Sequence, residues 1–194
     1  MNRDVRTLRE HALYAAALRL IEQGCDPKEM KVQQIAEAAG IGKGTVYEYF
    51  SSKNEILHGM SLYIFDDELN RLQTRLQGCT TAEGLAAAVG AYLTDLAKTR
   101  MGVYRIIAGS AAGAHLCGDP GKNQRTEALR TLVRSTLQRL QDAGQIDPAL
   151  GMDYCVYALV SATAGGFLAL AADPGIDPDA MGGHICRLLE RALQ

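Results

Sequence analysis

The sequence predicts an all-helical protein, and three observations support this fold class. Apolar residues recur at helical spacing, few β-branched residues alternate with polar ones as in a strand, and the five prolines fall between the periodic stretches. With 47% apolar and 22% charged residues, the 194-residue chain has the composition of a globular protein with a buried core. Its length suits one domain, or a small domain joined to a larger one.

Nine helices are expected along the chain. They cover residues 5–23, 33–49 (two short helices), 52–77, 82–99, 102–116, 124–143, 148–172 and 178–193. The first helix ends at Gly24, a typical terminating residue, and its expected apolar stripe consists of Leu8, Ala12, Ala16 and Leu20. Ser52 and Glu55 have the spacing of a capping box, which places the start of the fourth helix.

Two Asp-Pro steps are expected to open the last two helices. Asp147 and Asp177 each offer a side-chain acceptor at an N-cap position. The proline after each aspartate suits the first helical turn, where its missing N–H costs nothing. A loop of residues 117–123 is expected before the helix over 124–143.

Residues 154–172 contain no charged side chain. A membrane span is disfavoured because the segment carries tyrosines, hydroxyl side chains and a Gly165-Gly166 pair, and lacks basic flanks. A helix that is apolar all round is otherwise buried on several sides. We expect its own domain to cover one side and a second copy of the chain to cover the other, with a purely intramolecular core helix as the alternative.

The segment from Val32 to Lys53 has the spacing of a helix-turn-helix. Ala36 is small where the second helix would cross the first, and Gly40 can adopt the left-handed conformation that ends the first helix. Ile41 and Val46 would hold the second helix onto the first. In such a unit the second helix lies in the major groove of DNA with its N-terminal residues at the bases and phosphates.

Several side chains of this segment can contact DNA. Lysines, hydroxyl groups and a glycine that lets the backbone approach are suited to phosphates and base edges. The candidate DNA-binding residues are Gln33, Lys43, Gly44, Thr45, Tyr47, Tyr49 and Lys53. Arg3, Arg6 and Arg9 are expected to form a basic N-terminal arm.

Other kinds of site fit the sequence less well. GIGKGT lacks the Ser or Thr directly after Lys43 that a phosphate-binding Walker loop requires, and no local catalytic signature is present, so neither a catalytic residue nor a cofactor is expected. His184 and Cys186, like His115 and Cys117, are two residues apart. A helix would point such a pair to nearly opposite sides, so no metal site is expected.

The helix-turn-helix motif resembles the TetR/AcrR-type family of transcriptional regulators. The family pattern, an apolar helix ending in Gly followed by IAxxAGxxxGTxYxYFxxKxxL, is matched by LRLIEQG and by IAEAAGIGKGTVYEYFSSKNEIL. Gly42 departs from it, since family members commonly have Ser or Thr there. The resemblance implies a DNA-binding domain over residues 1–52 and an effector-binding and dimerisation domain over 53–194.

The resemblance also implies partners. A homodimer would form through the helices over about 148–172 and 178–193, and the chain would bind a double-stranded DNA operator. Helices five to eight would enclose a pocket for a small-molecule effector. Candidate pocket residues are Tyr92, Tyr104, Arg105, Tyr157 and Phe167, with His115 as a further polar group.

The charge distribution is compatible with DNA binding by one end of the chain. The net charge of the whole chain is −2. Residues 1–53 contain eight basic and seven acidic residues, whereas residues 54–194 contain twelve basic and fifteen acidic residues. No secretory signal opens the sequence and the five cysteines contain no CxxC pair, so a cytoplasmic protein without a membrane partner is expected. The expected function is a ligand-responsive repressor; the alternatives are a partner-binding module that lost DNA and, less well supported, a helical enzyme.

Overall fold

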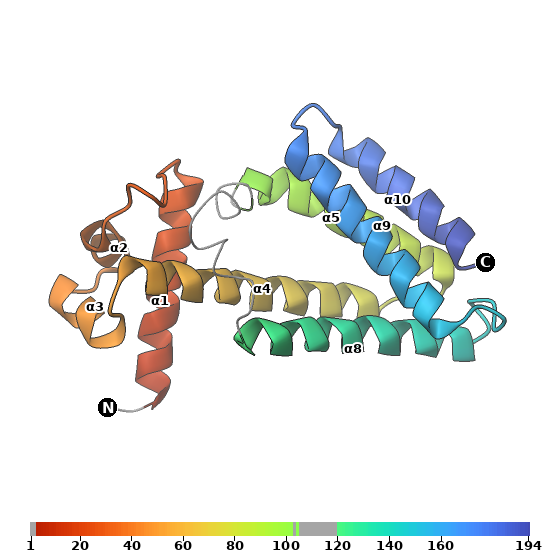
Figure 1. The fold of residues 1–194 in the computed structure, drawn as a ribbon, viewed down its shortest axis with the longest axis horizontal. Coiled ribbons are helices and arrows are strands. Elements are labelled where there is room, and N and C mark those ends of the chain that lie inside the picture. The colour runs from red at the N-terminus through yellow and green to blue at the C-terminus, as the bar shows by residue number, and fades with distance from the viewer. Residues whose placement is uncertain (1–2, 103, 105–119) are drawn as a thin grey trace. The chain divides into compact units, whose positions relative to one another are not determined.

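The structure is a computed structural model that describes residues 3–102, 104 and 120–194, and all regular structure in these residues is helical (Figure 1). The eight described helices are α1 (Arg3–Glu22), α2 (Val32–Ala39), α3 (Lys43–Tyr49), α4 (Lys53–Gln77), α5 (Ala82–Thr99), α8 (Pro120–Asp142), α9 (Met152–Ala172) and α10 (Pro178–Ala192). The predicted all-α class is confirmed. The helix expected over 102–116 lies almost entirely outside the described residues, and the eight described helices correspond to the other eight of the nine expected.

The chain divides into two compact units. The N-terminal unit contains residues 1–67 and 102–125, and the C-terminal unit contains 68–101 and 126–194. Each unit has its own hydrophobic core, one built mainly from α1 to α3 with the start of α4, the other from α5, α8, α9 and α10. These structural units divide α4 near its middle, whereas the functional boundary after residue 52 is a proposal.

Helix α1 contributes a different stripe to the core from the expected one. Leu13, Ala17 and Ile21 are buried with Ala16, whereas the expected member Leu8 is 68% exposed. The expected stripe is therefore wrong at its N-terminal end. Gly24 ends the helix as expected, with φ 92° and its N–H donating to the carbonyl oxygen of Ile21 at 2.9 Å.

The start of α4 has the expected capping groups. The N–H of Glu55 donates to Oγ of Ser52 at 3.2 Å, and the carboxylate of Glu55 accepts from the N–H of Ser51 at 2.7 Å. Because two otherwise unpaired N–H groups are satisfied in this way, the turn after α3 leads directly into α4.

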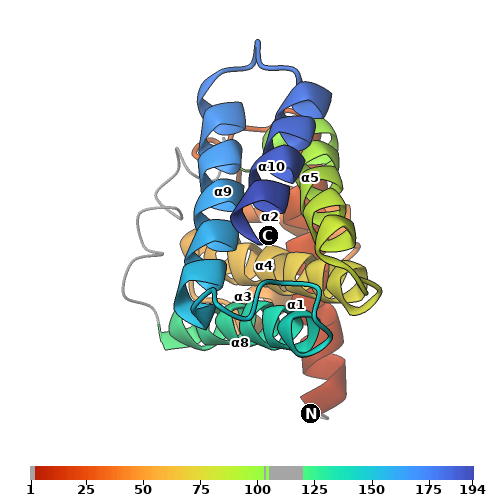
Figure 2. The same ribbon diagram turned by 90° about the vertical axis from the view of Figure 1, so that its right-hand side faces the viewer.

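Helices α5, α9 and α10 pack on one another in the C-terminal unit (Figure 2). Leu85, Leu93 and Leu189 are buried where they meet. Helix α10 begins as expected, since Asp177 is its N-cap and accepts from the N–H of Asp179 at 3.2 Å.

Two expected helix starts are wrong. Asp147 and Pro148 form a turn instead of opening a helix, with the N–H of Leu150 donating to the carbonyl oxygen of Asp147 at 3.1 Å, and α9 begins later, after its N-cap Gly151. Helix α8 begins at Pro120, within the segment expected to be a loop, because proline suits the first position of a helix.

Candidate functional site

Helices α2 and α3 form the predicted helix-turn-helix. Ile35 and Ala36 of α2 are buried at 0% and 2% exposure, and Val46 of α3 is fully buried beside them. Gly40 ends α2 in the left-handed conformation, with φ 67°. The N–H of Gly40 donates to the carbonyl oxygen of Glu37 at 3.1 Å, and the N–H of Ile41 donates to the carbonyl oxygen of Ala36 at 2.9 Å. This pair of bonds is a left-handed C-cap, which only glycine adopts without strain.

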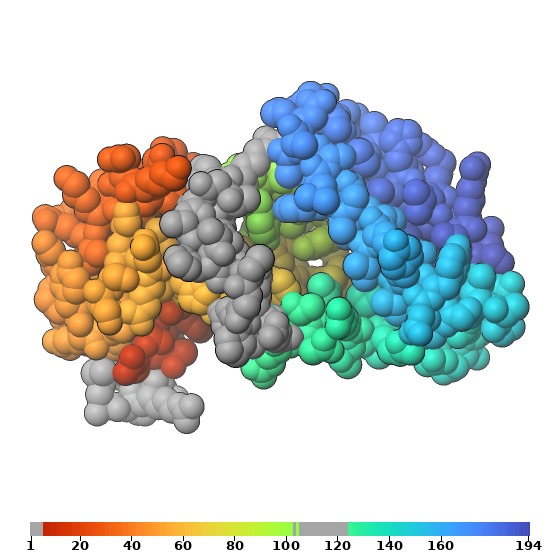
Figure 3. Space-filling model, in the orientation of Figure 1, coloured from red at the N-terminus to blue at the C-terminus, as the bar shows by residue number. Residues whose placement is uncertain are grey.

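Helix α3 lies in the orange part of the space-filling view of the N-terminal unit (Figure 3), and the residues of its N-terminal end are at the surface. Gly42 is the N-cap in extended conformation and supplies no side-chain acceptor, so N–H groups of the first turn stay available. Lys43 and Gly44 are exposed, Thr45 is half-buried, and Tyr47 is 52% exposed. This is the surface that the sequence predicts for DNA.

The first turn of α2 is held by its own glutamines. Gln34 accepts with Oε1 from the N–H of Lys31 at 2.8 Å, and exposed Gln33 donates with Nε2 to Oε1 of Glu37 at 3.0 Å. The expected contact residue Gln33 is therefore at the surface, but an acidic neighbour holds its amide.

Two other candidates have protein partners. The ring of Tyr49 is 5% exposed and belongs to the core of the N-terminal unit, and its hydroxyl accepts from Nη1 of Arg9 at 3.1 Å. Half-buried Lys53 donates with Nζ to the carbonyl oxygen of Lys28 at 2.7 Å. The basic residues expected as an N-terminal arm are instead part of a helix, because α1 begins at Arg3.

Aromatic rings behind the helix-turn-helix hold α1 against α4. The ring of Tyr14 lies edge-on to Phe50 with centroids 5.7 Å apart and is 6.1 Å from Tyr63, and it covers Gly59, where a Cβ would collide with it. Burial raises the pKa of Tyr14 to about 12, and the nearby Glu10 adds to the shift. The cluster was not predicted from the sequence, because its members come from three segments.

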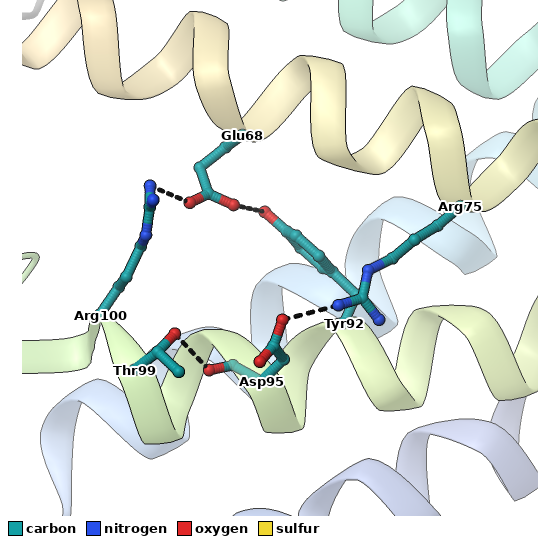
Figure 4. Close-up of polar contacts among 6 residues, drawn as sticks. All are labelled: Glu68, Arg75, Tyr92, Asp95, Thr99 and Arg100. Atoms are coloured by element: carbon teal, nitrogen blue, oxygen red, sulfur yellow. Dashed lines mark hydrogen bonds and ion pairs between the residues drawn. The ribbon is translucent and has the colours of Figure 1, made fainter.

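A small polar pocket lies between α4 and α5 in the C-terminal unit (Figure 4). The carboxylate of Glu68 accepts from Arg100 at 2.7 Å and from the hydroxyl of Tyr92 at 3.3 Å, and Arg75 pairs with Asp95 at 2.6 Å. Burial, and then the charge of Glu68, raise the pKa of Tyr92. A phenol in this position remains a neutral donor.

The pocket candidates from the sequence are dispersed. Tyr92 lines the polar pocket, Phe167 packs on the core of the C-terminal unit, and Tyr104 packs on the core of the N-terminal unit. Tyr157 is 72% exposed on α9, and Arg105 lies outside the described residues, as does His115.

The charged residues of the pocket were not among the residues predicted from the sequence. The sequence feature that could have indicated some of them is their spacing on α4. Glu68, Arg71 and Arg75 recur at i, i+3 and i+7, which places them on one face of the helix. Among the described residues, no group of three or more His, Cys, Asp or Glu side chains could hold a metal ion.

Helix α9 presents apolar side chains to its surroundings. By length and composition it is the one described helix apolar enough to cross a membrane, and 28% of its most apolar stretch is buried. A core helix of a soluble protein passes the same test, so this is weak evidence for a span. The exposed large apolar side chains here are Tyr154, Tyr157, Val160 and Leu168 of α9 and Leu188 of α10.

Known proteins resemble this chain both in the helix-turn-helix motif and in the fold. Residues 13–60 match the family model of bacterial regulatory proteins, tetR family. No curated protein sequence matches the chain.

Several solved structures share the fold over the length of the chain. A putative TetR-family transcriptional regulator from Mesorhizobium loti is 18% identical, with 100% of this chain and 98% of that chain covered and a TM-score of 0.72. The regulator FadR from Bacillus subtilis, in complex with stearoyl-CoA, is 18% identical over 95% and 99%, with a TM-score of 0.69. NalD from Pseudomonas aeruginosa, the secondary repressor of the MexAB-OprM multidrug efflux pump, is 20% identical over 97% and 98%, with a TM-score of 0.64.

Proposed function

We propose that this chain, a TetR-type transcriptional regulator with an N-terminal helix-turn-helix, is a homodimeric repressor that a small-molecule effector releases from a near-palindromic operator. Regulators of this family act on DNA in the cytoplasm and are not enzymes, and we assign both properties to this chain. The observation that supports the proposal most is the arrangement of α3, which is anchored by buried Val46 and open at its N-terminal end.

The chemistry of α3 suits a DNA groove. Seven residues make a helix about 10 Å long, which fits across a major groove about 12 Å wide. Lys43 supplies a cation for a phosphate or a guanine edge, exposed Gly44 permits close backbone approach, and the hydroxyls of Thr45 and Tyr47 can donate to phosphate oxygens. Gln33 of α2 and Lys53 of α4 are further candidates, and each has a hydrogen bond within the protein.

The apolar surface of α9 and α10 supports a two-fold dimer. Tyr157 and Leu168 are largely exposed on a helix that carries no charge from residue 154 to residue 172, which is costly unless another chain covers them. A two-fold axis makes such a surface bind its own copy, and it repeats the recognition helix about one DNA turn away. The operator is then near-palindromic.

The effector is a small molecule that binds the C-terminal unit. FadR was solved with stearoyl-CoA and SmeT with triclosan, so proteins of this fold hold ligands of different chemistry. In this chain the polar pocket around Glu68 and Tyr92 is one described region of that unit with hydrogen-bonding groups, and because these groups are paired with one another, a ligand there would have to replace those bonds. Release follows if the ligand favours a conformer whose recognition helices no longer match the operator.

The test is operator binding by surface variants of α3. A duplex is selected by the wild-type protein from a random pool, and its affinity is measured for Lys43→Ala and Tyr47→Ala. Each variant is expected to bind at least tenfold more weakly, with an unchanged thermal unfolding temperature, because both side chains are at the surface. Lys98→Ala is the control, at an exposed lysine of α5 whose ion pair with Asp179 lies within the C-terminal unit. Wild-type affinity in both α3 variants would remove the assignment.

A further inference from the structure

Tyr49 joins the last turn of α3 to two arginines of α1. Nη1 of Arg9 donates to the tyrosine hydroxyl at 3.1 Å, and the guanidinium carbon of Arg6 lies 5.8 Å from the centroid of its ring. The ring itself is fixed, since it is buried among the core residues of the N-terminal unit. A rigid phenol thus holds two long side chains that would otherwise sample many rotamers.

The two arginines retain their capacity to bind an anion. They are three residues apart on α1 and share one face of the helix, and both are exposed. Arg6 also pairs with Glu10 at 2.8 Å, and this carboxylate raises the pKa of the guanidinium. Arg9 uses one of its five N–H donors on Tyr49, so its other donors remain for phosphate oxygens.

The position of this pair complements that of Lys43. Lys43 is the first residue of α3 and Tyr49 is the last, so cations lie near both ends of a helix about 10 Å long. The phosphates of the two DNA strands line the two sides of a major groove of about 12 Å. A helix lying across the groove therefore brings Lys43 toward one strand and the arginines of α1 toward the other.

We propose that Arg9, with Arg6 beside it, is a phosphate-binding group of this protein and that Tyr49 is the positioning residue that holds it at the C-terminal end of α3. The inference rests on the proposed DNA binding and assigns an indirect role to Tyr49, which the sequence predicts as a direct contact. It also specifies that α1 and α3 bind opposite strands of one groove. The competing explanation is that the arginines only stabilise the carbonyl end of α3 and the packing of α1.

The salt dependence of operator binding separates the two explanations. The affinity of the full-length protein for the duplex selected by the wild type is measured over a series of KCl concentrations. Each phosphate contact contributes about 0.9 to the slope of log affinity against log salt concentration, so Arg9→Gln is expected to flatten the slope by about 0.9 per subunit. Arg9→Lys, which keeps the charge, is expected to restore most of the slope.

Tyr49→Phe tests the positioning role, because it keeps the ring and removes the hydroxyl. We expect weaker binding and a slope between those of the wild type and Arg9→Gln. Arg130→Gln is the control, an exposed arginine of α8 whose ion pair is with Glu127 on the same helix. Wild-type slopes in Arg9→Gln and Tyr49→Phe, together with a lowered unfolding temperature, would show a purely structural role. Failure of the wild type to bind any duplex would instead overturn the proposed function, and this inference with it.

Discussion

Gly90 of α5 and Gly182 of α10 meet backbone to backbone. A Cβ atom at Gly90 would lie 2.5 Å from the carbonyl oxygen of Gly182, and one at Gly182 would lie 2.8 Å from that of Gly90. Next to this contact, Oγ1 of Thr94 donates to the carbonyl oxygen of Pro178 at 3.1 Å. The two helices are therefore as close as their backbones allow, and a hydrogen bond between them keeps the register.

Gly90→Ala is expected to destabilise the C-terminal unit. The new methyl group would meet a backbone carbonyl, which cannot rotate away, so α5 and α10 must separate at a cost of about 2 kcal/mol. This cost exceeds the gain of up to about 1 kcal/mol that alanine brings to a helix interior. Urea unfolding at fixed protein concentration measures the change. Equal stability of the variant and the wild type would contradict the close contact.

Gly44→Ala separates stability from DNA binding. A Cβ at Gly44 would meet nothing within 4 Å, so the protein accepts alanine and its α3 gains about 0.5–1 kcal/mol of helix preference. The methyl group would nevertheless occupy the space through which, in the proposed function, the backbone approaches DNA. We expect an unfolding temperature equal to or above that of the wild type and an operator affinity reduced about tenfold or more, measured by fluorescence anisotropy. An unchanged affinity would indicate that α3 binds without close backbone approach.

The outcome of the two Asp-Pro steps shows how far local sequence determines the fold. Asp177 and Pro178 are succeeded directly by residues that continue a helix, whereas Gly151 comes three residues after Pro148. At the first step the side chain of Asp147 accepts from the N–H of Ala149 at 2.8 Å within a turn, and α9 begins only after its N-cap Gly151. The same Asp-Pro pair therefore forms a turn at one place and opens a helix at the other, so the pair alone does not determine where a helix begins.

The helix-turn-helix could be predicted from local sequence, whereas the polar pocket could not. Ala36, Gly40 and Val46 lie within one short segment, so their spacing alone predicts how α2 meets α3. Glu68 and Arg100 are distant in sequence and meet only because α4 and α5 pack together. No local pattern could pair them, and for the same reason the sequence could not tell that Tyr157 is exposed on α9.

The stability of the protein is expected to fall in alkaline solution because of Tyr14 and Tyr92. The folded-state pKa of each phenol is raised, to about 12 for Tyr14, from the ordinary value of 10.0. Below about pH 10 each phenol is protonated in both the folded and the unfolded protein, so it contributes no pH dependence. Above about pH 10 the phenols lose their protons in the unfolded protein but keep them in the folded protein, so the free energy of unfolding decreases as the pH rises. Urea unfolding from about pH 9 to about pH 11 should show a shallower decrease in Tyr14→Phe and Tyr92→Phe than in the wild type. A decrease as steep as that of the wild type in both variants would show that other groups cause it.

Leu168→Glu is expected to dissociate the proposed homodimer. Leu168 is 65% exposed within the single chain, so a glutamate there disturbs no intramolecular core, but in the dimer it would bury a charge without a partner. Leu8→Glu is a closely matched control, because Leu8 is 68% exposed and lies on α1 in the other structural unit. Sedimentation velocity at micromolar concentration should show a monomer for Leu168→Glu and a dimer for Leu8→Glu and the wild type, with the same helical circular dichroism in all three. Because useful operator affinity requires two linked recognition helices, the monomeric variant should also lose operator binding although α3 is intact. A dimeric Leu168→Glu would place the interface elsewhere on the chain.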